Sequence, residues 1–395
     1  MKKTLVAAGI LGAFAVAAHA QSSVTLYGSL DAGIVFANNV GGHSTWLQNS
    51  GTVSSTYFGL RGAEDLGGGL KAIFTLESGF NVNNGGFHGD GMFDRKAYVG
   101  LTSPTTGTLT LGRQYDSVVD YLSPLSAAGF GYGNNLAGHP FDNDNLGGGF
   151  SIKNSVKYES ANYDGFKFGG LYGFSNEAGG FANGRAWSVG ASYHTGPLNV
   201  AAAYLQLNNS GSLAGAQAAA SADSNISARL QRTYGVGANY SFGPAVLGVV
   251  WTHSQIDGLD SLSSGGVQSA AMTAPGSLNL RVDNFEVNGV YSLTPSLALL
   301  GSYTFTNGRV TGSHSYFGSN NPKWHSFMLA ADYSLSRRTD VYVAGAYQHA
   351  SGSLGFYTQP NGGYGRYDNV AAINTLPGSA TRSQVAGTVG LRHRF

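Results

Sequence analysis

Apolar and polar side chains alternate along most of the chain. Near the start, Val24, Leu26 and Leu30 alternate with Thr25 and Ser29. Successive side chains on a strand point to opposite faces, so such a segment has one apolar and one polar face. The pattern therefore predicts an all-β protein. The same alternation recurs over residues 297–306, 326–335 and 385–395.

The connections between these segments alternate in length. The short ones are rich in the turn-forming residues Gly, Pro, Asp and Ser. The seven short connections lie at 64–69, 103–107, 163–165, 196–197, 243–244, 294–295 and 336–339. The eight long, polar connections lie near 37–55, 81–94, 117–150, 175–185, 208–231, 255–281, 307–323 and 350–382. These alternating connections join 16 strands, and short turns at one end with long loops at the other indicate an antiparallel transmembrane β-barrel. An even strand count places the N- and C-termini at the short-turn end, which we expect to face the periplasm.

Four tyrosines repeat at one position relative to the short turns. Tyr193, Tyr240, Tyr291 and Tyr333 each lie three residues before a turn and share the parity of their strand's apolar face. An amphipathic ring suits the boundary between lipid and water, so a row of tyrosines is expected there. The alternative is core packing in a soluble β-sandwich. The clean segregation of long and short connections favours the membrane.

The first residues predict export. A short positively charged start precedes an apolar, uncharged run over residues 4–18, and small residues stand at Ala18 and Ala20, where a signal peptidase reads the chain. The alternative is a membrane anchor, but the apolar run is shorter than the ~20 residues a spanning helix needs. We expect a signal peptide over 1–20 and a barrel domain over 21–395.

Composition agrees with a wall that has lipid on one side and water on the other. Charged residues make up 11% of the chain, against about 25% in a typical soluble domain. Aromatic residues reach 12%, Gly numbers 60 and Cys is absent, so closed hydrogen bonding rather than disulfides must supply the stability. The net charge is +1 without a clustered basic stripe, and we expect no nucleic-acid partner.

Several segments carry a resemblance to a known family. They read VTLYG at 24–28, GLRGAEDLG at 59–67, LKAIFTLE at 70–77, RKAYVGL at 95–101 and LTLGRQ at 109–114, with NSVKY at 154–158 and the terminal Phe395. Together they resemble the general diffusion porins of Gram-negative bacteria, most closely the betaproteobacterial branch. The segments are specific as a set, and they span the mature chain.

The resemblance implies a homotrimer of 16-stranded barrels in the outer membrane, each with its own pore. It implies passive diffusion of small hydrophilic solutes and ions through a water-filled channel, without a cofactor or a metal. It also implies that the third long loop folds inward and narrows the pore. Phe395 has lipid-facing parity and resembles the assembly signal that the outer-membrane insertion machinery reads.

The third long loop, residues 117–150, has a composition that fits an inward fold. It is unusually apolar for a segment exposed to water. A barrel of this width keeps an aqueous lumen, so filtering requires an element that restricts it. The apolar residues are Val118, Val119, Tyr121, Leu122, Leu125, Phe130, Tyr132 and Phe141.

Parity assigns several charges to the lumen. On the second predicted strand, Tyr57 and Arg61 face inward, opposite to Phe58 and Leu60. The other side chains expected to face inward are Asp31, Lys71, Thr75 and Glu77.

Parity does not settle the fourth strand, where the resemblance favours Arg95 inward and Tyr98 outward. Lys153 begins the sixth strand beside the loop, and the family lines one wall with such basic residues. Arg113 matches the family's Gly-Arg-Gln motif, but its parity with Leu109 and Leu111 points it outward, toward a possible subunit contact.

The loop departs from the family at its tip. Many relatives carry Pro-Glu-Phe-Gly-Gly there, whereas this chain has PLSAA at 124–128, so Asp116, Asp120, Asp142 and Asp144 are its nearest acids. The expected constriction comprises Tyr57, Arg61, Arg95, Lys153, Asp116 and Asp120. With basic residues ahead of acidic ones, we expect a weak anion preference that fades as salt rises.

Two other functions remain as alternatives. An outer-membrane barrel can be a hydrolase, but the ten His residues show no zinc-site spacing and no Gly-x-Ser-x-Gly elbow is present. A substrate-specific channel would carry a graded aromatic track, and Tyr27 and Tyr57 alone do not form one. The general porin therefore remains the favoured function.

Overall fold

The computed structural model describes residues 23–89, 91–129, 134–213, 215, 217–220, 224–264, 267–269, 278–312, 321–358, 364–374 and 376–395. The predicted signal peptide over 1–20 and the loop aromatics Phe130 and Tyr132 lie outside these residues. Within the described ranges, no helix is both long and apolar enough to cross a membrane.

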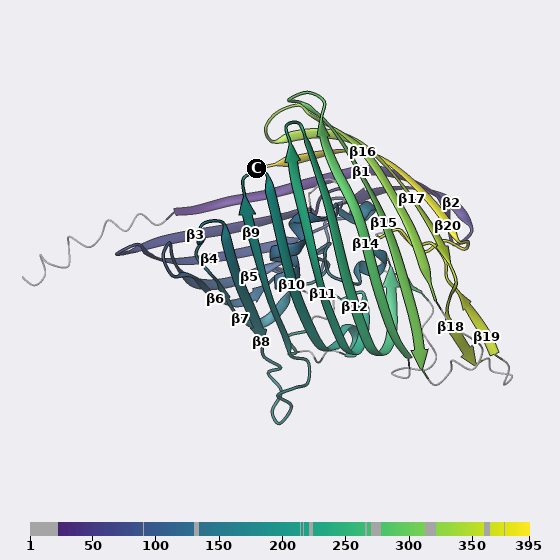
Figure 1. Ribbon diagram of the computed structural model, residues 1–395, viewed down its shortest axis with the longest axis horizontal. Helices are drawn as coiled ribbons and strands as arrows, with labels where there is room; N and C mark the ends of the chain where they lie inside the picture. Colours follow the sequence, from purple (N-terminus) through teal and green to yellow (C-terminus); the bar gives the residue numbers. More distant parts are fainter. Residues whose placement is uncertain are drawn as a thin grey trace, which may run out of the picture.

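Sixteen antiparallel strands form a closed barrel, as the sequence predicted (Figure 1). Consecutive strands pair with one another, and the last strand closes the barrel against the first, with Ile34 opposite Val389. The strands are β1 (Ser23–Val40), β3 (Tyr57–Gly67), β4 (Leu70–Gly79), β5 (Lys96–Ser103), β6 (Gly107–Gln114), β7 (Ile152–Glu159), β8 (Phe166–Gly173), β9 (Ala186–Thr195), β10 (Leu198–Ser210), β11 (Ile226–Phe242), β12 (Ala245–Ser264), β14 (Leu278–Ser292), β15 (Leu297–Gly312), β16 (Lys323–Ser334), β17 (Thr339–Ser351) and β20 (Ser383–Arg394).

Within the described residues of the long connections lie four shorter strands. They are β2 (His43–Ser50), β13 (Val267–Ser269), β18 (Ser353–Thr358) and β19 (Tyr364–Asp368). The first strand, β1, pairs with β3 over its first residues and with β2 from Ala32 onward. Residues 51–56 interrupt this shared edge, and Val53 within them is only 1% exposed.

The predicted connections fall in the expected places. All seven short ones join consecutive strands, and all eight long ones contain the longer segments between strands. Some strands run further than predicted: β12 continues to Ser264 and β14 begins at Leu278, where a loop over 255–281 was expected. Beyond the lipid both faces of the wall meet polar surroundings, so the alternation ends while the ladder of hydrogen bonds continues.

The wall of the barrel differs in height around its circumference. Strands β5 to β8 have eight residues each, whereas β11, β12, β14 and β15 have 15 to 20. Figure 1 shows the longer strands in teal and green beside the shorter blue ones. Eight residues fall short of the ~9–11 that a strand needs to cross a bilayer.

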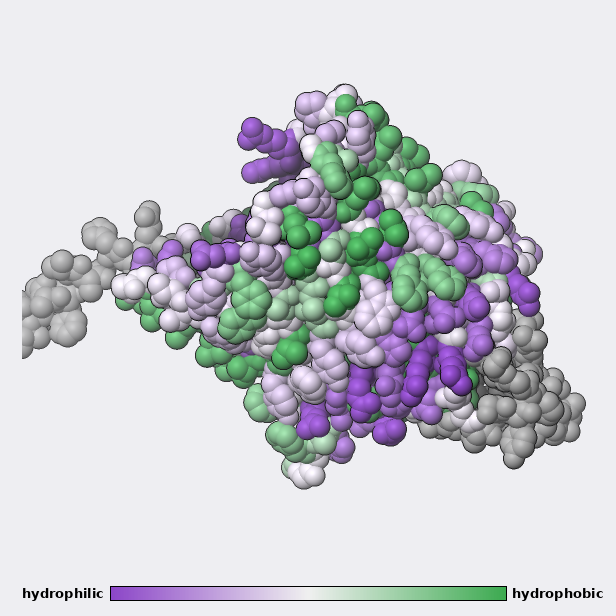
Figure 2. Space-filling model, in the orientation of Figure 1, coloured by the Kyte–Doolittle hydropathy of each residue, from purple (hydrophilic) through white to green (hydrophobic). Residues whose placement is uncertain are grey.

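The exterior of the barrel is apolar and its interior is polar. Along β14, Phe285, Val287 and Tyr291 are about half exposed, whereas Asn284 and Glu286 between them are buried. All four tyrosines of the predicted boundary row are 41–48% exposed on the outer surface. Figure 2 shows the corresponding hydrophobic band across the middle of the wall.

The described residues of the third long connection include four short helical turns. It runs between the end of β6 and the start of β7. The turns are η1 (Val118–Leu122), η2 (Ser123–Leu125), α2 (Asn134–Ala137) and η3 (Pro140–Asp142). A further turn, η4 (Gly211–Leu213), follows β10.

Candidate channel constriction

Apolar residues of the third long connection pack against the wall at positions that glycine occupies. Val118 and Leu122 are fully buried there. A Cβ built at Gly190 of β9 would lie 2.6 Å from the Tyr121 ring, and one at Gly235 of β11 would lie 2.8 Å from Leu122. Glycine therefore leaves the space that the loop residues fill, which gives a physical reason for the loop's apolar composition.

A buried histidine joins the loop to the long strands. Nδ1 of His139 lies 2.6 Å from Oδ2 of Asp144, and Nε2 lies 3.0 Å from Oε2 of Glu286 on β14. Thr252 on β12 donates a hydrogen bond to Asp144, and Ala127 donates its backbone N–H to Glu286 at 2.7 Å. Every polar atom of the His139 ring is therefore partnered. Both halves of the loop are thus fastened to β14, and the second half is also fastened to β12.

The charge state of this histidine follows from its two neighbours. Burial lowers the pKa of His139, but the carboxylates of Asp144 and Glu286 outweigh it and raise the pKa to about 10. Burial also raises the pKa of Asp144, yet the charge of His139 outweighs it and leaves the pKa of Asp144 below its ordinary value. The loop is thus held by an imidazolium between two carboxylates.

Arg95 faces the loop from the opposite wall. Its Nε donates to Oε1 of Glu77 at 2.7 Å, and Nζ of Lys96 lies 3.4 Å from Oε2 of the same carboxylate. The guanidinium lies 4.8 Å from the ring centre of Tyr57 and 5.6 Å from that of Tyr115. An arginine between two aromatic rings and a carboxylate is restrained in position.

Arg61 lies along the same wall. Its guanidinium is 5.1 Å from the ring centre of Tyr27, whose hydroxyl donates to Glu77 at 2.9 Å. Within the described part of the chain, no carboxylate lies at ion-pair distance from Arg61. The positive charge of Arg61 is therefore less compensated than that of Arg95.

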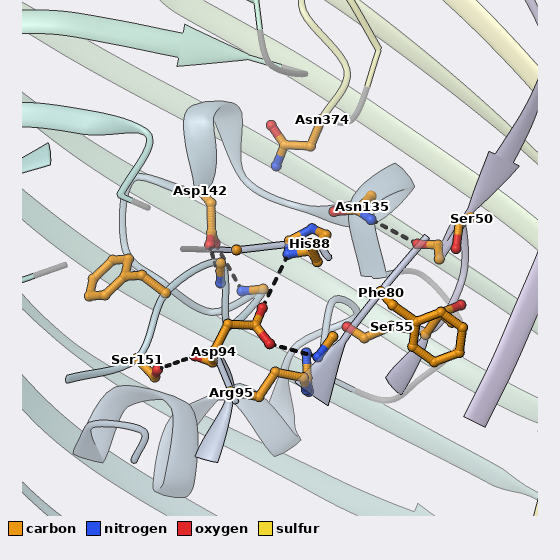
Figure 3. Close-up of a pocket in the computed structure, with 18 of the residues that line it drawn as sticks. Ser50, Ser55, Phe80, His88, Asp94, Arg95, Asn135, Asp142, Ser151 and Asn374 are labelled. Atoms are coloured by element: carbon orange, nitrogen blue, oxygen red, sulfur yellow. Dashed lines mark hydrogen bonds and ion pairs between the residues drawn. The ribbon is translucent and has the colours of Figure 1, made fainter. Parts of the chain in front are cut away.

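A hollow of about 470 Å³ separates this wall from the loop. Arg95, Arg113 and Tyr115 line it on the wall side, and Asp142 lines it on the loop side. Figure 3 shows Asp142 and Asn135 across the hollow from Asp94 and Arg95. Burial raises the pKa of Asp142 to about 6, although the backbone N–H groups of Gly147 and Gly149 donate to its carboxylate.

A second hollow of about 190 Å³ shares part of the same lining. Tyr57, Arg95 and Tyr115 border it on the wall side, and Ser123 and Gly129 border it on the loop side. Of the six residues that the sequence placed at a constriction, Tyr57 and Arg95 line this opening.

The two loop acids of that set lie within the loop packing. Asp116 is fully buried and accepts hydrogen bonds from the backbone of Val118 and the amide of Asn145, each at 2.7 Å. Burial raises the pKa of Asp116 to about 6. Asp120 forms an ion pair with Lys157 on β7. Neither carboxylate borders the two hollows.

The side chain of Arg113 faces inward, and the prediction from strand parity was wrong. The sequence pointed it outward, toward a subunit contact, but its Nε donates to Ser151 at 2.7 Å and its side chain lines the larger hollow. The pairing of β6 with β7 shifts register between Gly112 and Gln114, and Gly112 has a φ of 140°. A bulge at Gly112 therefore reverses the facing of the next residue.

The side chain of Tyr98 also faces inward, and the prediction made from the resemblance was wrong. It was expected to face outward, but it lies opposite Thr75, whose side chain is buried on the lumen side. Val99 and Leu101, with the other parity, are the exposed residues of β5. Directly opposed residues share a face, so Tyr98 points inward.

The remaining predicted lumen residues occupy three environments. Asp31 is fully buried, and its Oδ1 accepts from the backbone N–H of Thr52 and the hydroxyl of Tyr342. Lys71 lies near the short-turn end of β4 and is exposed. Lys153 is half-buried, and its backbone N–H donates to the carbonyl of Ala219.

Sequence reasoning missed the residues that join distant parts of the chain. Tyr115 directly follows the Gly-Arg-Gln motif. This position in the sequence was a weak indication that Tyr115 lies near Arg95. His139 and Glu286 are 147 residues apart, and no local pattern connects them. Among the residues that the structure describes, no group of three His, Cys, Asp or Glu is arranged to hold a metal ion.

A closed barrel with an apolar exterior and a polar interior defines the class of outer-membrane channel proteins. The chain belongs to the Gram-negative porin family, whose model matches residues 5–353. It is an outer-membrane porin.

Two curated relatives support this assignment. An outer membrane porin protein of Bordetella pertussis is 34% identical over 393 residues, covering 88% of this chain and 94% of the relative. Outer membrane porin protein 32 of Delftia acidovorans is 36% identical over 216 residues, covering 50% of this chain and 58% of the relative.

Two solved structures share the fold. The anion-selective porin from Comamonas acidovorans has a TM-score of 0.66 and 23% identity, covering 95% of this chain and all of that one. The trimer form of OmpT from Vibrio cholerae has a TM-score of 0.60 and 17% identity, covering 95% and 99%.

Proposed function

We propose that the chain is a general diffusion channel whose narrowest part lies between the wall around Arg95 and the inward-folded third loop. Tyr57 and Arg95 form one side of this constriction, and the loop held by His139 forms the other. Asp116 and Asp120 act by fixing the shape of the loop, while Arg61 and Lys153 add charge along the path. Small hydrophilic solutes and ions pass without a cofactor.

The observation that carries this proposal is the shared lining of the two hollows. Arg95 and Tyr115 border both, so a solute that moves from the larger hollow to the smaller one passes the same side chains. A passage lined by water-exposed polar groups on both sides suits hydrophilic solutes rather than apolar ones.

The charge balance favours a weak anion preference. Glu77 neutralises much of the field of Arg95, and Asp120 neutralises Lys157, whereas Arg61 lies beside the Tyr27 ring and, among the described residues, has no carboxylate at ion-pair distance. Salt screens charges beyond about 8–10 Å at physiological strength, so the preference should fade as salt rises. The solved porin from Comamonas acidovorans is described as anion-selective, which agrees in direction.

The test is the reversal potential of purified channels in a planar bilayer under a salt gradient. A charge at a water-filled surface is worth roughly 0.2–1 kcal/mol, so replacing both Arg61 and Arg95 with Ser should lower the anion-to-cation permeability ratio about two- to 25-fold at low salt. The control replaces Arg337 and Arg338, exposed at a short turn, with Ser. An unchanged reversal potential in the Arg61/Arg95 variant would show that these residues do not line the narrow path.

We also propose that the chain assembles into a homotrimer, as expected for its family. A homotrimer is supported by the eight-residue strands β5 to β8, which are too short to face lipid alone, and by the trimeric form of a structural neighbour. We propose contact with outer-membrane lipids around the longer strands and recognition of Phe395 by the insertion machinery. We further propose that the chain is not an enzyme. The histidine with two carboxylate neighbours, His139, has a side chain only 1% exposed and so lies out of reach of a solute.

A further inference from the structure

The register of the long strands arranges their outward side chains in rows. Arg232 on β11 lies opposite Gln255 on β12, Gln255 lies opposite Arg281 on β14, and Arg281 lies opposite Arg309 on β15. Lys323 on β16 lies opposite Asn307, the next outward residue below Arg309. We call the three residues Arg281, Arg309 and Lys323 the basic row.

The basic row lies one hydrocarbon thickness from the tyrosines at the short-turn end. Arg281 is ten residues from Tyr291 along β14, and Lys323 is ten residues from Tyr333 along β16. Ten residues at ~3.3 Å each, on strands tilted by roughly 40°, span about 25 Å, the height of a barrel's apolar band. The basic row is thus placed at the far lipid surface, on the loop side.

Aromatic rings mark this surface directly below the row. Phe285 lies 6.4 Å from Phe305, Phe305 lies 5.0 Å from the ring of His325, and Tyr303 lies 4.7 Å from Phe327. Rings of this kind collect where acyl chains meet headgroups. Figure 2 shows strongly hydrophilic residues at the loop ends of these strands, next to the hydrophobic band.

The charges of the basic row are not balanced by the protein. Arg281 and Arg309 are both exposed and directly opposed, an arrangement of like charges that is unfavourable by itself. Within the part of the chain that the structure describes, no carboxylate lies at ion-pair distance from any of the three cations. The nearby acids have other partners: Asp257 lies 3.7 Å from Arg232, and Asp283 accepts from His253 at 2.8 Å if that ring nitrogen is protonated.

A hollow adjoins the row. It has a volume of about 290 Å³ and is lined by Asn307, Gly308, Arg309, Asn321 and Lys323. Two cations and two amide side chains therefore border one space, at the level where the headgroup of a lipid lies. Guanidinium groups bind phosphate oxygens in pairs, so this set of donors suits a phosphate.

We propose that Arg281, Arg309 and Lys323 bind the phosphate of an anionic lipid headgroup in the outer leaflet. The aromatic rings below hold the acyl chains at the matching depth, and the phosphate relieves the repulsion between Arg281 and Arg309. The long wall of the barrel thereby carries a specific lipid at its outer rim. This site is independent of the pore.

The test measures binding of a fluorescent diphosphorylated glycolipid to the folded, detergent-solubilised protein. Replacing Arg281 and Arg309 with Gln should weaken binding at least tenfold, since both charge-assisted phosphate contacts are lost. The matched control, Arg337→Gln with Arg338→Gln, removes two exposed arginines at the opposite end and should bind as wild type does. A third variant, Arg281→Lys with Arg309→Lys, keeps the charge but loses the paired guanidinium donors, so its affinity should lie between those of wild type and the Gln variant.

Two further probes separate the sources of phosphate. The same glycolipid without phosphate should bind as weakly to wild type as the diphosphorylated lipid binds to the Gln variant. Inorganic phosphate at equal concentration should not displace the lipid. Equal affinity of wild type and the Gln variant, equal binding of the dephosphorylated lipid, or displacement by inorganic phosphate would each overturn the proposal.

Discussion

His139 keeps its charge inside a protein because two carboxylates face it. Its side chain is only 1% exposed, and an isolated imidazolium there would lose its proton. Asp144 and Glu286 reverse that tendency and fix the ring between the loop and β14. Removing one member of such a group leaves the others buried without compensation, which is the costly case for buried ion pairs.

His139→Gln should loosen the third loop. Loss of a buried charged partner costs roughly 3–5 kcal/mol, because the Asp144 and Glu286 carboxylates then lie buried without a cation. We expect frequent brief closures and excess current noise in single-channel recordings. His194→Gln is the control, since His194 is exposed near a short turn and its ring contacts Asn199, far from the third loop. Quiet channels in the His139 variant would contradict an anchoring role.

The same residue predicts a direction for the effect of pH. The pKa of His139 is raised from 6.5 to about 10, so its stabilisation of the loop is complete below 6.5 and is lost as pH rises toward 10. The pKa of Asp144 is lowered from 3.8, so its contribution holds above that value and is lost in stronger acid. Closures of the wild-type channel should therefore increase between pH 6.5 and 10. The His139→Gln channel should lack this increase.

At the scale of elements, the strands and the third loop are determined by different features of the sequence. Strands need only alternate sides, so β14 carries Phe285 and Val287 outward beside Asn284 and Glu286 inward. The loop needs a surface that fits it, and the glycines of β9 and β11 supply one. The loop's position therefore depends on residues that its own sequence does not contain.

The last strand provides a prediction at this scale. The backbone N–H of Phe395 donates to Gly28, and that of Gly28 donates to Phe395, both at 3.1 Å. Two hydrogen bonds are worth only ~0.5–1.5 kcal/mol each, so their loss alone should not abolish folding. If Phe395 is an assembly signal, its deletion should strongly reduce the amount of heat-modifiable folded protein in cells. The same deletion should lower the stability of the purified, folded barrel only slightly.

A second variant separates the ring of Phe395 from its backbone. Phe395→Ala keeps the backbone hydrogen bonds with Gly28 and removes only the aromatic group, which is 36% exposed on the lipid side. We expect it to lower the folded yield nearly as much as the deletion does, with synthesis unchanged. An undiminished yield in both variants would count against recognition of the terminal residue.

At the scale of the molecule, the two ends of the barrel differ. Figure 1 shows the C-terminus at the end opposite the long connection that follows β8. The chain has no Cys, so single cysteines can be introduced and labelled on intact cells. Ala178→Cys, in a long loop, should react with a membrane-impermeant maleimide, and Arg337→Cys, in a short turn, should react only after the membrane is opened. The reverse result would overturn the predicted orientation.

The sequence by itself determined the barrel, its strand number and the two kinds of connection. These features follow from local rules, because side chains alternate every residue along a strand and turns need particular residues at fixed places. The outward row of tyrosines and the inward facing of Arg61 and Glu77 follow from the same rules. Each can be read within about ten neighbouring residues.

Only the tertiary structure decided the details of the site. The bulge at Gly112 turned Arg113 inward, and the pairing of Tyr98 with Thr75 placed that ring in the lumen. His139 contacts Glu286, which is 147 residues further along the chain, and Arg281 lies opposite Arg309 because of the register of β14 with β15. A one-residue shift in register changes every facing that follows it, and contacts between distant segments depend on the closed barrel rather than on any local pattern.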